Sequence, residues 1–362
     1  MSKKYENLYE QLLSEIKYDL ENNIKKLPPE RILAEKYHVS RQTVRNALEI
    51  LEKEGCVHRV QGSGCGITGQ LPKSGRNTIG LLLECKGLYT GPIKASLFRT
   101  LLQKSDLQLK VFSSDLRVSG ERSALLEILE DSSILALIAE PVLSNIDSPN
   151  SELYEKIAAK GIPVIFMGGF YRNLQSFPFV KGDDFQGGRL LTKELLKKGH
   201  SRLGAIFNAN SGQGQGRYLG MCRTLAEAGL ELPDDNILWY TSRQLWELRD
   251  KNNTDFLIKY IRSNMSSVTA LICQDDSIAS ALAQELKYAR LHIPSDISIL
   301  SFDNSYLAEY SGAALSSLGY PPEGDPVHVT LQLLFRLLQG QPAASRLLSW
   351  QLYDRHSIAS LG

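Results

Sequence analysis

Apolar residues in the N-terminal part of the chain recur with the spacing of helix faces. Between residues 5 and 24 they fall every three or four positions, which predicts one face of a long amphipathic helix. They are Leu8, Tyr9, Leu12, Leu13, Ile16, Leu20 and Ile24. Pro28 and Pro29 end this helix. Since proline is tolerated in a first helical turn, Pro29 also suits the start of a second helix that runs to about Tyr37.

A third helix and a hairpin are predicted next. The third helix begins after Ser40, whose hydroxyl can cap it by accepting a hydrogen bond from the amide of Gln42 or Thr43, and it ends at Gly55. Short apolar stretches on either side of a glycine-rich turn at residues 62–66 predict a small hairpin. Three helices followed by a hairpin form a winged helix-turn-helix.

The pattern changes beyond residue 77, where short and nearly continuous apolar runs alternate with helical patterns. Such runs are typical of strands buried on both faces, and their alternation with helices predicts parallel sheets with helical crossovers. The runs are 79–83, 109–112, 134–138, 162–166, 203–207, 270–273 and 297–300. A region this long exceeds the length that a single hydrophobic core usually supports, so we expect two Rossmann-like lobes with a cleft between them. The glycine-rich stretch 208–216 is predicted to lie in a loop of the second lobe.

These patterns predict a multidomain chain. Residues 1–68 form a winged helix-turn-helix of the α+β class, and residues 78–362 form a two-lobed α/β region. Residues 69–77 between them are polar, contain glycine and proline, and show no periodicity, which is typical of a linker.

Composition and charge narrow the possible functions. Lys and Arg number 41 and Asp and Glu number 40, so the net charge of +1 excludes a uniformly basic chain and makes any contact with a polyanion local. The N-terminus lacks a continuous apolar signal segment and no later stretch is long enough to span a membrane, so we expect a cytoplasmic protein without a membrane partner. The five cysteines are scattered, with no metal-binding spacing, so no disulfide framework, metal or cofactor is predicted.

Residues 27–68 resemble the DNA-binding domain of the gluconate-repressor (GntR) family. The family's opening motif matches residues 28–34 (PPERILA), its central motif matches residues 39–45 (VSRQTVR), and its wing tip matches residues 61–64 (QGSG). The chain departs from the family after the wing tip, where Cys65-Gly66 stands in place of Thr followed by Phe or Tyr. The missing aromatic leaves the conformation of the wing open.

The geometry of the DNA grooves predicts which of these residues contact bases and which contact the phosphate backbone. A helix that enters the major groove presents its N-terminal residues to base edges, where Arg pairs with guanine and Gln with adenine. The helix residues so placed are Arg41, Gln42 and Arg45. The residues suited to the phosphate backbone are Arg31, Ser40, Thr43, Gln61, Gly62, Ser63 and Gly64. The alternative is that these polar groups form an ordinary solvated helix face and that the hairpin is a simple β-turn.

The chain from Arg76 onward resembles the effector-binding half of lactose-repressor-type regulators, which have the fold of periplasmic sugar-binding proteins. The matching stretches are 183–190 (DDFQGGRL), 195–203 (LLKKGHSRL), 217–220 (RYLG), 275–276 (DD), 293–298 (IPSDIS) and 301–304 (SFDN). The resemblance implies a sugar between the two lobes, with Arg217, Asp275 and Asp303 as its ligands. The family often has an acidic residue after the strand that ends at Met167, where this chain has Gly168.

The chemistry of these side chains suits a polyol, because carboxylates and guanidinium groups pair with adjacent hydroxyls. The alternatives are that Asp275 and Asp303 cap helices and that Arg217 is a structural ion-pair partner. Near the predicted strand ends lie aromatic residues that can stack on a sugar or simply pack in the core: Tyr89, Phe170, Trp239 and Tyr240. Glu84 and Lys86 are further candidates for the cleft.

The combination of a GntR-type DNA-binding domain with a sugar-repressor-type sensor domain resembles the arabinose-responsive repressors of bacilli. This resemblance implies that the ligand is a pentose such as L-arabinose. We therefore expect a homodimeric transcriptional repressor that binds a double-stranded DNA operator and responds to a small sugar, and not an enzyme. One alternative is a sugar-processing or nucleotide-binding enzyme that uses glycines 212–216 with Asp275 and Asp276. These glycines lack the spacing of a dinucleotide-binding or P-loop motif. A transport-linked binding protein leaves the N-terminal reader unexplained.

Overall fold

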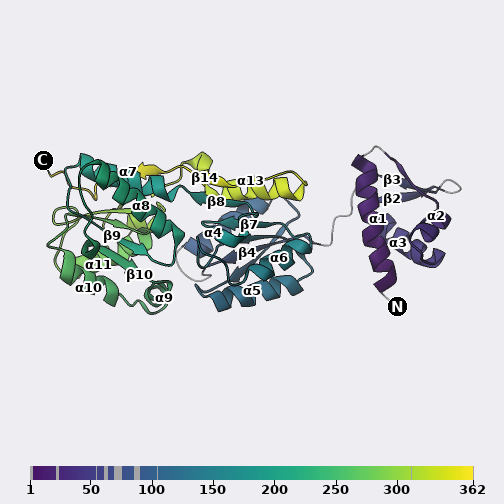
Figure 1. Ribbon diagram of the computed structural model, residues 1–362, viewed down its shortest axis with the longest axis horizontal. Helices are drawn as coiled ribbons and strands as arrows, with labels where there is room; N and C mark the ends of the chain where they lie inside the picture. Colours follow the sequence, from purple (N-terminus) through teal and green to yellow (C-terminus); the bar gives the residue numbers. More distant parts are fainter. Residues whose placement is uncertain are drawn as a thin grey trace. The chain divides into compact units, whose positions relative to one another are not determined.

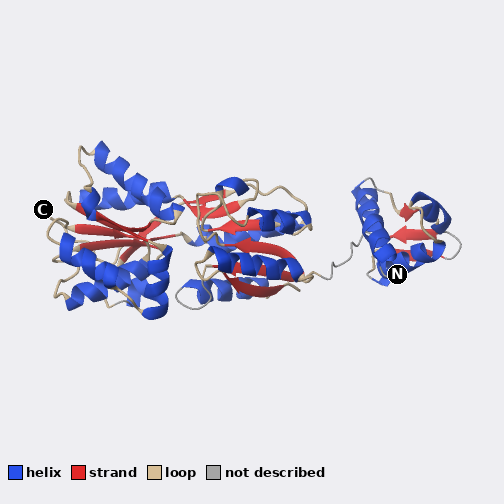
Figure 2. Cartoon of the chain, turned by 60° about the horizontal axis from the view of Figure 1, so that its bottom comes forward, coloured by secondary structure: helices blue, strands red, loops and turns tan. Residues whose placement is uncertain are grey.

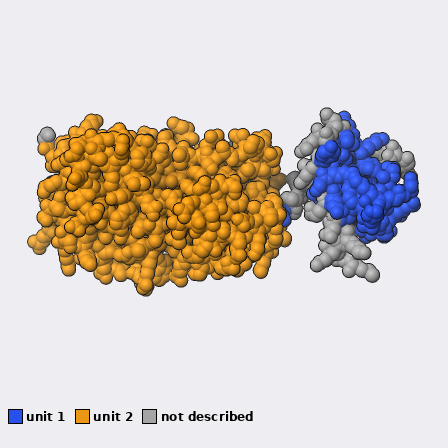
Figure 3. Space-filling model, in the orientation of Figure 1, with its two compact units in different colours: residues 1–76 blue, residues 77–362 orange. Residues whose placement is uncertain are grey.

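The computed structural model describes residues 3–21, 24–53, 55–60, 64–68, 76–84, 90–103, 105–310 and 312–361. The chain forms two compact units, residues 1–76 and residues 77–362 (Figure 3). Within the described residues, no helix is long and apolar enough to cross a membrane.

The first unit packs three helices against a small antiparallel sheet (Figure 1). Its elements are α1 (Lys3–Glu21), β1 (Lys26–Leu27), α2 (Glu30–Lys36), α3 (Arg41–Lys53), β2 (Val57–Val60) and β3 (Gly64–Ile67). One apolar cluster holds them together, with Leu12, Leu33 and Leu48 fully or almost fully buried. The three predicted helices and the hairpin are confirmed.

Two details of this unit differ from the prediction. The strand β1 is new and pairs with β3, so the sheet has the order β1-β3-β2. Gly64, Cys65 and Gly66 belong to β3 and not to the turn. In this strand Gly66 pairs with His58 of β2, and a Cβ at position 66 would collide with the His58 ring. His58 thus fills the space next to the position of the missing aromatic.

The second unit contains two lobes, each with a six-stranded sheet covered by helices on both faces (Figure 2). In the first lobe the strand order is β14-β8-β7-β6-β4-β5, all parallel. Its strands are β4 (Thr78–Leu83), β5 (Gln108–Ser113), β6 (Ile134–Ala139), β7 (Val164–Met167), β8 (Phe179–Gly182) and β14 (Arg346–Leu348). Its helices are α4 (Thr90–Leu102), α5 (Val118–Glu130), α6 (Ser151–Ala159) and α13 (Pro326–Leu338).

The second lobe repeats this architecture with the order β10-β9-β11-β12-β13-β15, in which only β15 is antiparallel. Its strands are β9 (Leu203–Asn208), β10 (Ile237–Tyr240), β11 (Ala270–Cys273), β12 (Ser298–Phe302), β13 (Ser316–Gly319) and β15 (Gln351–Tyr353). Its helices are α7 (Asp184–Lys197), α8 (Gly212–Glu227), α9 (Ser242–Lys251), α10 (Asp255–Asn264), α11 (Asp276–Tyr288) and α12 (Tyr306–Tyr310). Short 3₁₀ turns occur at Arg172–Leu174, Asp234–Asn236 and Pro322–Gly324.

All seven predicted strands are present, and the two-lobed α/β fold is confirmed. The prediction of a glycine-rich loop at 208–216 was wrong in its second half, because α8 begins at Gly212. The glycines there allow close packing. A Cβ on Gly214 would lie 2.6 Å from the Asn208 carbonyl oxygen, and one on Gly216 would lie 2.9 Å from the Asp184 Cβ.

The chain crosses between the lobes three times, after β8, β13 and β14. Two of these crossings are joined directly, since the Asp183 amide donates to the Leu348 carbonyl at 2.9 Å and the Trp350 indole donates to the Asp183 carbonyl at 2.8 Å. Tyr320, on the third crossing, stacks on Trp350 with ring centroids 4.4 Å apart. The three segments therefore form one hinge.

Candidate functional site

The helix α3 presents a polar face because its apolar face is completely used in the core. Val44, Ala47, Leu48 and Leu51 are buried, and Arg41, Gln42 and Arg45 are exposed. The Ser40 hydroxyl accepts the Thr43 amide at 3.1 Å and lies 2.8 Å from the Thr43 hydroxyl, which confirms the predicted cap. The first turn of the predicted reading helix is thus fixed before any DNA contact.

Several of the predicted DNA contacts already have partners within the unit. Arg45 pairs with Glu30 at 2.9 Å, and the hydrogen bond and charge of Glu30 raise the pKa of Arg45. Arg31 pairs with Glu35 at 2.9 Å, and Gln42 donates to Asn46 at 2.9 Å. These exposed pairs are weak in water and can be exchanged for phosphate or base contacts. In the wing, Gly64 begins β3, whereas Gln61, Gly62 and Ser63 lie outside the described residues.

In the second unit, a cavity of about 40 Å³ lies between the two lobes. Its walls come from the carboxyl ends of parallel strands, which is where ligands bind in open α/β folds. The lining residues are Glu84, Pro141, Val142 and Ser144 from the first lobe and Asn208, Ser211, Gln213, Tyr240, Ser242, Leu245, Arg249, Gln274 and Asp275 from the second. A cavity of this size has room for about three water molecules, so a sugar enters only if side chains or lobes move.

Tyr240 is the most informative residue of this wall. Its side chain is fully buried at the end of β10, and among the described residues its hydroxyl has no hydrogen-bond partner. Burial raises the pKa of Tyr240 well above its ordinary value, so the hydroxyl keeps its proton as a donor. A buried hydroxyl without a partner costs free energy, which makes this one a candidate donor to a ligand in the cavity.

The cleft carries acidic groups from both lobes. Loss of hydration, strengthened by the negative charge of Glu140, raises the pKa of Glu84 to about 7. The same effect, with the charge of Asp275, raises the pKa of Asp303 to about 7. Asp303 nevertheless keeps a solvent-accessible side chain, as expected of a group that faces water inside a cleft.

Asp275 and Asp303 occupy the predicted strand ends, with different roles. Asp275 caps α11, accepting the Ile278 amide at 2.9 Å and the Ser277 hydroxyl at 2.5 Å, and it also lines the cavity. Asp303 directly follows β12 with φ of +93°, a value that non-glycine residues seldom adopt. It is not among the residues that line the cavity.

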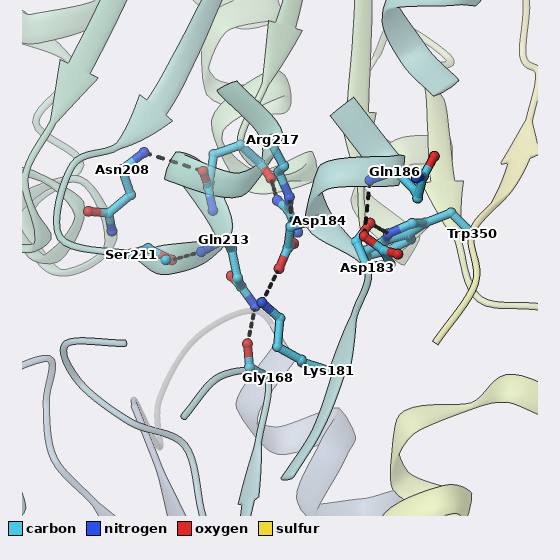
Figure 4. Close-up of polar contacts among 12 residues, drawn as sticks. Gly168, Lys181, Asp183, Asp184, Gln186, Asn208, Ser211, Gln213, Arg217 and Trp350 are labelled. Atoms are coloured by element: carbon cyan, nitrogen blue, oxygen red, sulfur yellow. Dashed lines mark hydrogen bonds and ion pairs between the residues drawn. The ribbon is translucent and has the colours of Figure 1, made fainter. Parts of the chain in front are cut away.

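Arg217 is a buried structural cation, with only 2% of its surface exposed. Its guanidinium pairs with Asp184 at 3.2 Å, donates to the Gln274 carbonyl, and lies 3.8 Å from the centre of the Phe302 ring. Lys181 reaches the other oxygen of Asp184 at 2.9 Å (Figure 4). Arg217 thus holds the hinge side of the second lobe, and it reaches the cavity only through Gln274.

The predicted aromatic residues are spread over different surroundings. Phe170 stacks on Phe179 at 4.7 Å in the first lobe. Trp239 is 38% exposed and packs edge-on against Tyr218 at 5.2 Å. Neither lines the cavity. Tyr89 and Lys86 lie outside the described residues.

Two hydrogen bonds join the lobes beside the cavity. The Gln213 side chain donates to the Gly168 carbonyl at 2.8 Å, and the Gly212 amide donates to the Ser144 hydroxyl at 2.8 Å. Figure 4 shows Gln213 reaching from α8 across to Gly168. Ser144 and Gln213 were not predicted as site residues. The sequence indicates them only by their position in predicted turns next to predicted strands or helices.

Two family models match separate parts of the chain. Residues 4–67 match the model of the bacterial regulatory proteins of the gntR family, and residues 192–358 match a periplasmic binding protein-like domain. Among solved structures, a periplasmic binding protein/LacI transcriptional regulator from Alkaliphilus metalliredigens QYMF, complexed with D-xylulofuranose, has a TM-score of 0.64 at 19% identity. It covers 78% of this chain and 100% of that one. The transcription regulator CcpA of Lactococcus lactis has a TM-score of 0.65 at 18% identity, covering 78% and 99%.

Curated relatives match over most of the chain. An arabinose metabolism transcriptional repressor of Halalkalibacterium halodurans is 28% identical over 89% of this chain and 86% of its own length. Another, of Geobacillus stearothermophilus, is 30% identical over 88% of this chain and 86% of its own length. These relatives are transcriptional regulators and not enzymes. The chain therefore belongs to the family of the arabinose metabolism transcriptional repressors, which here joins a GntR-type DNA-binding domain to a periplasmic-binding-protein-like domain.

Proposed function

We propose that this protein is a homodimeric repressor whose affinity for its operator changes when a monosaccharide, such as the pentose L-arabinose, binds between the two lobes. The observation that carries this proposal is the polar cavity at the strand ends, with the unpartnered Tyr240 hydroxyl in its wall. The arabinose repressors among its relatives, and the sugar named with a solved relative, support a sugar as the ligand.

Side chains of the cavity suit alternating hydroxyl groups. Glu84 and Asp275 supply carboxylate acceptors, and Ser144, Asn208 and Gln274 offer oxygens that accept or groups that donate. Asp303, Arg217, Phe170, Trp239 and Tyr89 remain part of the proposed binding region, as residues that reach the ligand when the lobes move. Because the sugar can shift the equilibrium only by binding two arrangements unequally, lobe movement is the step that connects it to DNA.

DNA binding is proposed to use the exposed face of α3 together with the wing. Arg41, Gln42 and Arg45 read base edges in the major groove. Contacts to the phosphate backbone come from Arg31, Ser40, Thr43, Gln61, Gly62, Ser63 and Gly64. Two such readers in a dimer meet successive major grooves, so the operator is expected to be pseudo-palindromic, with half-site centres one or two turns of about 10.5 base pairs apart.

The test is fluorescence anisotropy of labelled DNA from upstream of the protein's own gene, in about 0.15 M salt with nonspecific competitor. We expect tight binding that one pentose reverses. Hexoses and sugar phosphates serve as comparison ligands, and Arg41→Ala serves as the DNA-binding control. Specific DNA binding that no sugar changes, together with no heat of sugar binding in calorimetry, would refute the sensor role.

A further inference from the structure

A four-residue segment of the first lobe, residues 114–117, is seated on the second lobe. We call it the finger. Leu116 is only 8% exposed, and it belongs to the apolar cluster of the second lobe that also contains Tyr240 and Leu245. The Arg117 guanidinium lies 5.2 Å from the ring centre of Trp246 on α9. The finger therefore makes both an apolar and a cation–π contact across the cleft.

The backbone of the finger is held in an unusual conformation. Asp115 and Leu116 have φ values of +50° and +58°, and two successive non-glycine residues in this region persist only where the surroundings hold them. The Leu116 amide donates to the carbonyl of Glu84, a cavity residue, at 2.9 Å. On the other side, a Cβ at Gly120 would collide with the Ser114 carbonyl, so α5 packs directly against the finger.

A buried carboxylate lies behind this contact. Glu121, in the first turn of α5, is fully buried and accepts hydrogen bonds from three side chains: Tyr154 at 2.9 Å, Asn150 at 2.8 Å, and Tyr171. Three donors satisfy a charge that would otherwise be costly in the core.

Two of these partners extend the network in opposite directions. The Tyr171 hydroxyl also accepts the amide of Val142, a residue of the cavity wall, at 3.0 Å. The Asn150 amide group also donates to the carbonyl of Val118, which directly follows the finger, at 3.0 Å. A single carboxylate thus holds both the wall of the cavity and the base of the finger.

We propose that Glu121 is a positioning residue that couples the cavity wall at Val142 to the seating of Leu116 and Arg117 on the second lobe. A ligand that orders the wall then stabilises the seated finger, and the seated finger holds the lobes together. The sensing part of this inference rests on the proposed function, whereas the link between Tyr171, Glu121 and the finger concerns the ligand-free protein as well.

The test compares Tyr171→Phe with Tyr154→Phe in the full chain. Each substitution removes one hydroxyl donor from the same carboxylate oxygen and keeps the ring, but only Tyr171 is bonded to the cavity wall. Hydrogen exchange of the Leu116 amide in ligand-free protein reports the seating of the finger. We expect Tyr171→Phe to speed this exchange about fivefold relative to Tyr154→Phe, as for one lost hydrogen bond, and Glu121→Gln to speed it as well.

The second readout is the ratio of operator affinities without and with the sugar. We expect Tyr171→Phe to reduce this ratio about fivefold and Tyr154→Phe to leave it as in the wild type, although both variants lose stability in urea, Tyr171→Phe by the larger amount because it also loses the bond to Val142. Equal exchange and equal ratios in the two variants would overturn the inference. If the wild type responds to no sugar, the proposed function fails, and the exchange comparison still decides whether Tyr171 positions the finger.

Discussion

The motif residues of the two units differ in their burial and in their contacts. In the first unit, Arg41 and Gln42 of the motif at residues 39–45 are exposed, and the core is built without them. In the second unit, the corresponding motif residues are built into the framework. Arg217 is a buried ion-pair partner and Asp275 caps a helix.

This difference follows from what each unit binds. A DNA duplex is a large external surface, so the side chains that read it must protrude. A small ligand is enclosed, and its pocket must also be held in shape by buried charges and helix caps such as Arg217 and Asp275, of which Asp275 also lines the cavity. The matched motif therefore marks exposed side chains in the first unit, whereas in the second unit it marks residues that frame the cavity and, at Asp275, line it.

The largest expected effect tests the frame. Arg217→Ala leaves Asp184 buried with one cation fewer and removes the packing on Phe302, so we expect a loss of about 3–5 kcal/mol in the free energy of unfolding. All three tryptophans, at 239, 246 and 350, lie in the second unit, so tryptophan fluorescence in urea follows that unit alone. A loss below about 1 kcal/mol would mean that Arg217 is not part of the frame.

The next effect tests the exposed reader. Arg41→Ala should weaken operator binding by about 1–3 kcal/mol, because one bidentate base contact is lost. The free energy of unfolding, followed by far-UV circular dichroism, should stay within about 0.5 kcal/mol of the wild-type value, as for other surface substitutions. Glu49→Ala, further along the exposed side of α3, is the matched control and should leave operator affinity unchanged or raised. Operator binding that survives Arg41→Ala would remove α3 as the reading helix.

The fold is predictable from the sequence where local patterns specify it, and not where contacts between distant residues do. The seven predicted strands are nearly continuous apolar runs, so their burial in the sheets can be expected from their residues alone. The strand β13 was missed because it reads Ser-Ser-Leu-Gly, and its buried serines are stabilised by partners distant in sequence: Ser317 donates to Asp276 at 2.7 Å and Ser316 donates to Asp354 at 2.8 Å. Such strands are specified by tertiary hydrogen bonds, which no local pattern reveals.

The binding site was predictable to a similar degree. The positions of Asp275 and Asp303 after strands followed from the apolar runs, and Glu84 was a correct candidate for the cavity. Ser144 and Gln213 could not be found, because they become part of one site only when two lobes meet. Their partners, Gly212 and Gly168, are far away along the chain and lie in the opposite lobe.

A smaller effect is expected at the cavity wall. Tyr240→Phe removes a hydroxyl that has no hydrogen-bond partner among the described residues, so stability should stay equal or rise slightly. Sugar affinity in calorimetry should fall about fivefold, as for one lost hydrogen bond of about 1 kcal/mol. Tyr260→Phe is the matched control, since its buried hydroxyl donates to the Asn236 carbonyl at 2.7 Å. It should lose about 1 kcal/mol of stability and keep its sugar affinity. The reverse pattern would place the ligand elsewhere.

The smallest effect concerns pH. The pKa of Glu84 is raised from an ordinary value of 4.5 to about 7, so between these values the folded state binds more protons at this site than the unfolded state does. The contribution of Glu84 to the free energy of unfolding therefore falls as pH rises from about 4.5 to 7 and stays constant above that range. Glu84→Gln cannot titrate, so its stability relative to the wild type should increase from pH 5 to pH 8, by less than about 1 kcal/mol because cleft water screens the charge. Urea unfolding followed by tryptophan fluorescence at both pH values measures this difference. A difference that stays constant would mean that Glu84 faces open solvent, as the exposed residues of α3 do, and one that decreases would mean that nearby cations lower the pKa of Glu84 instead.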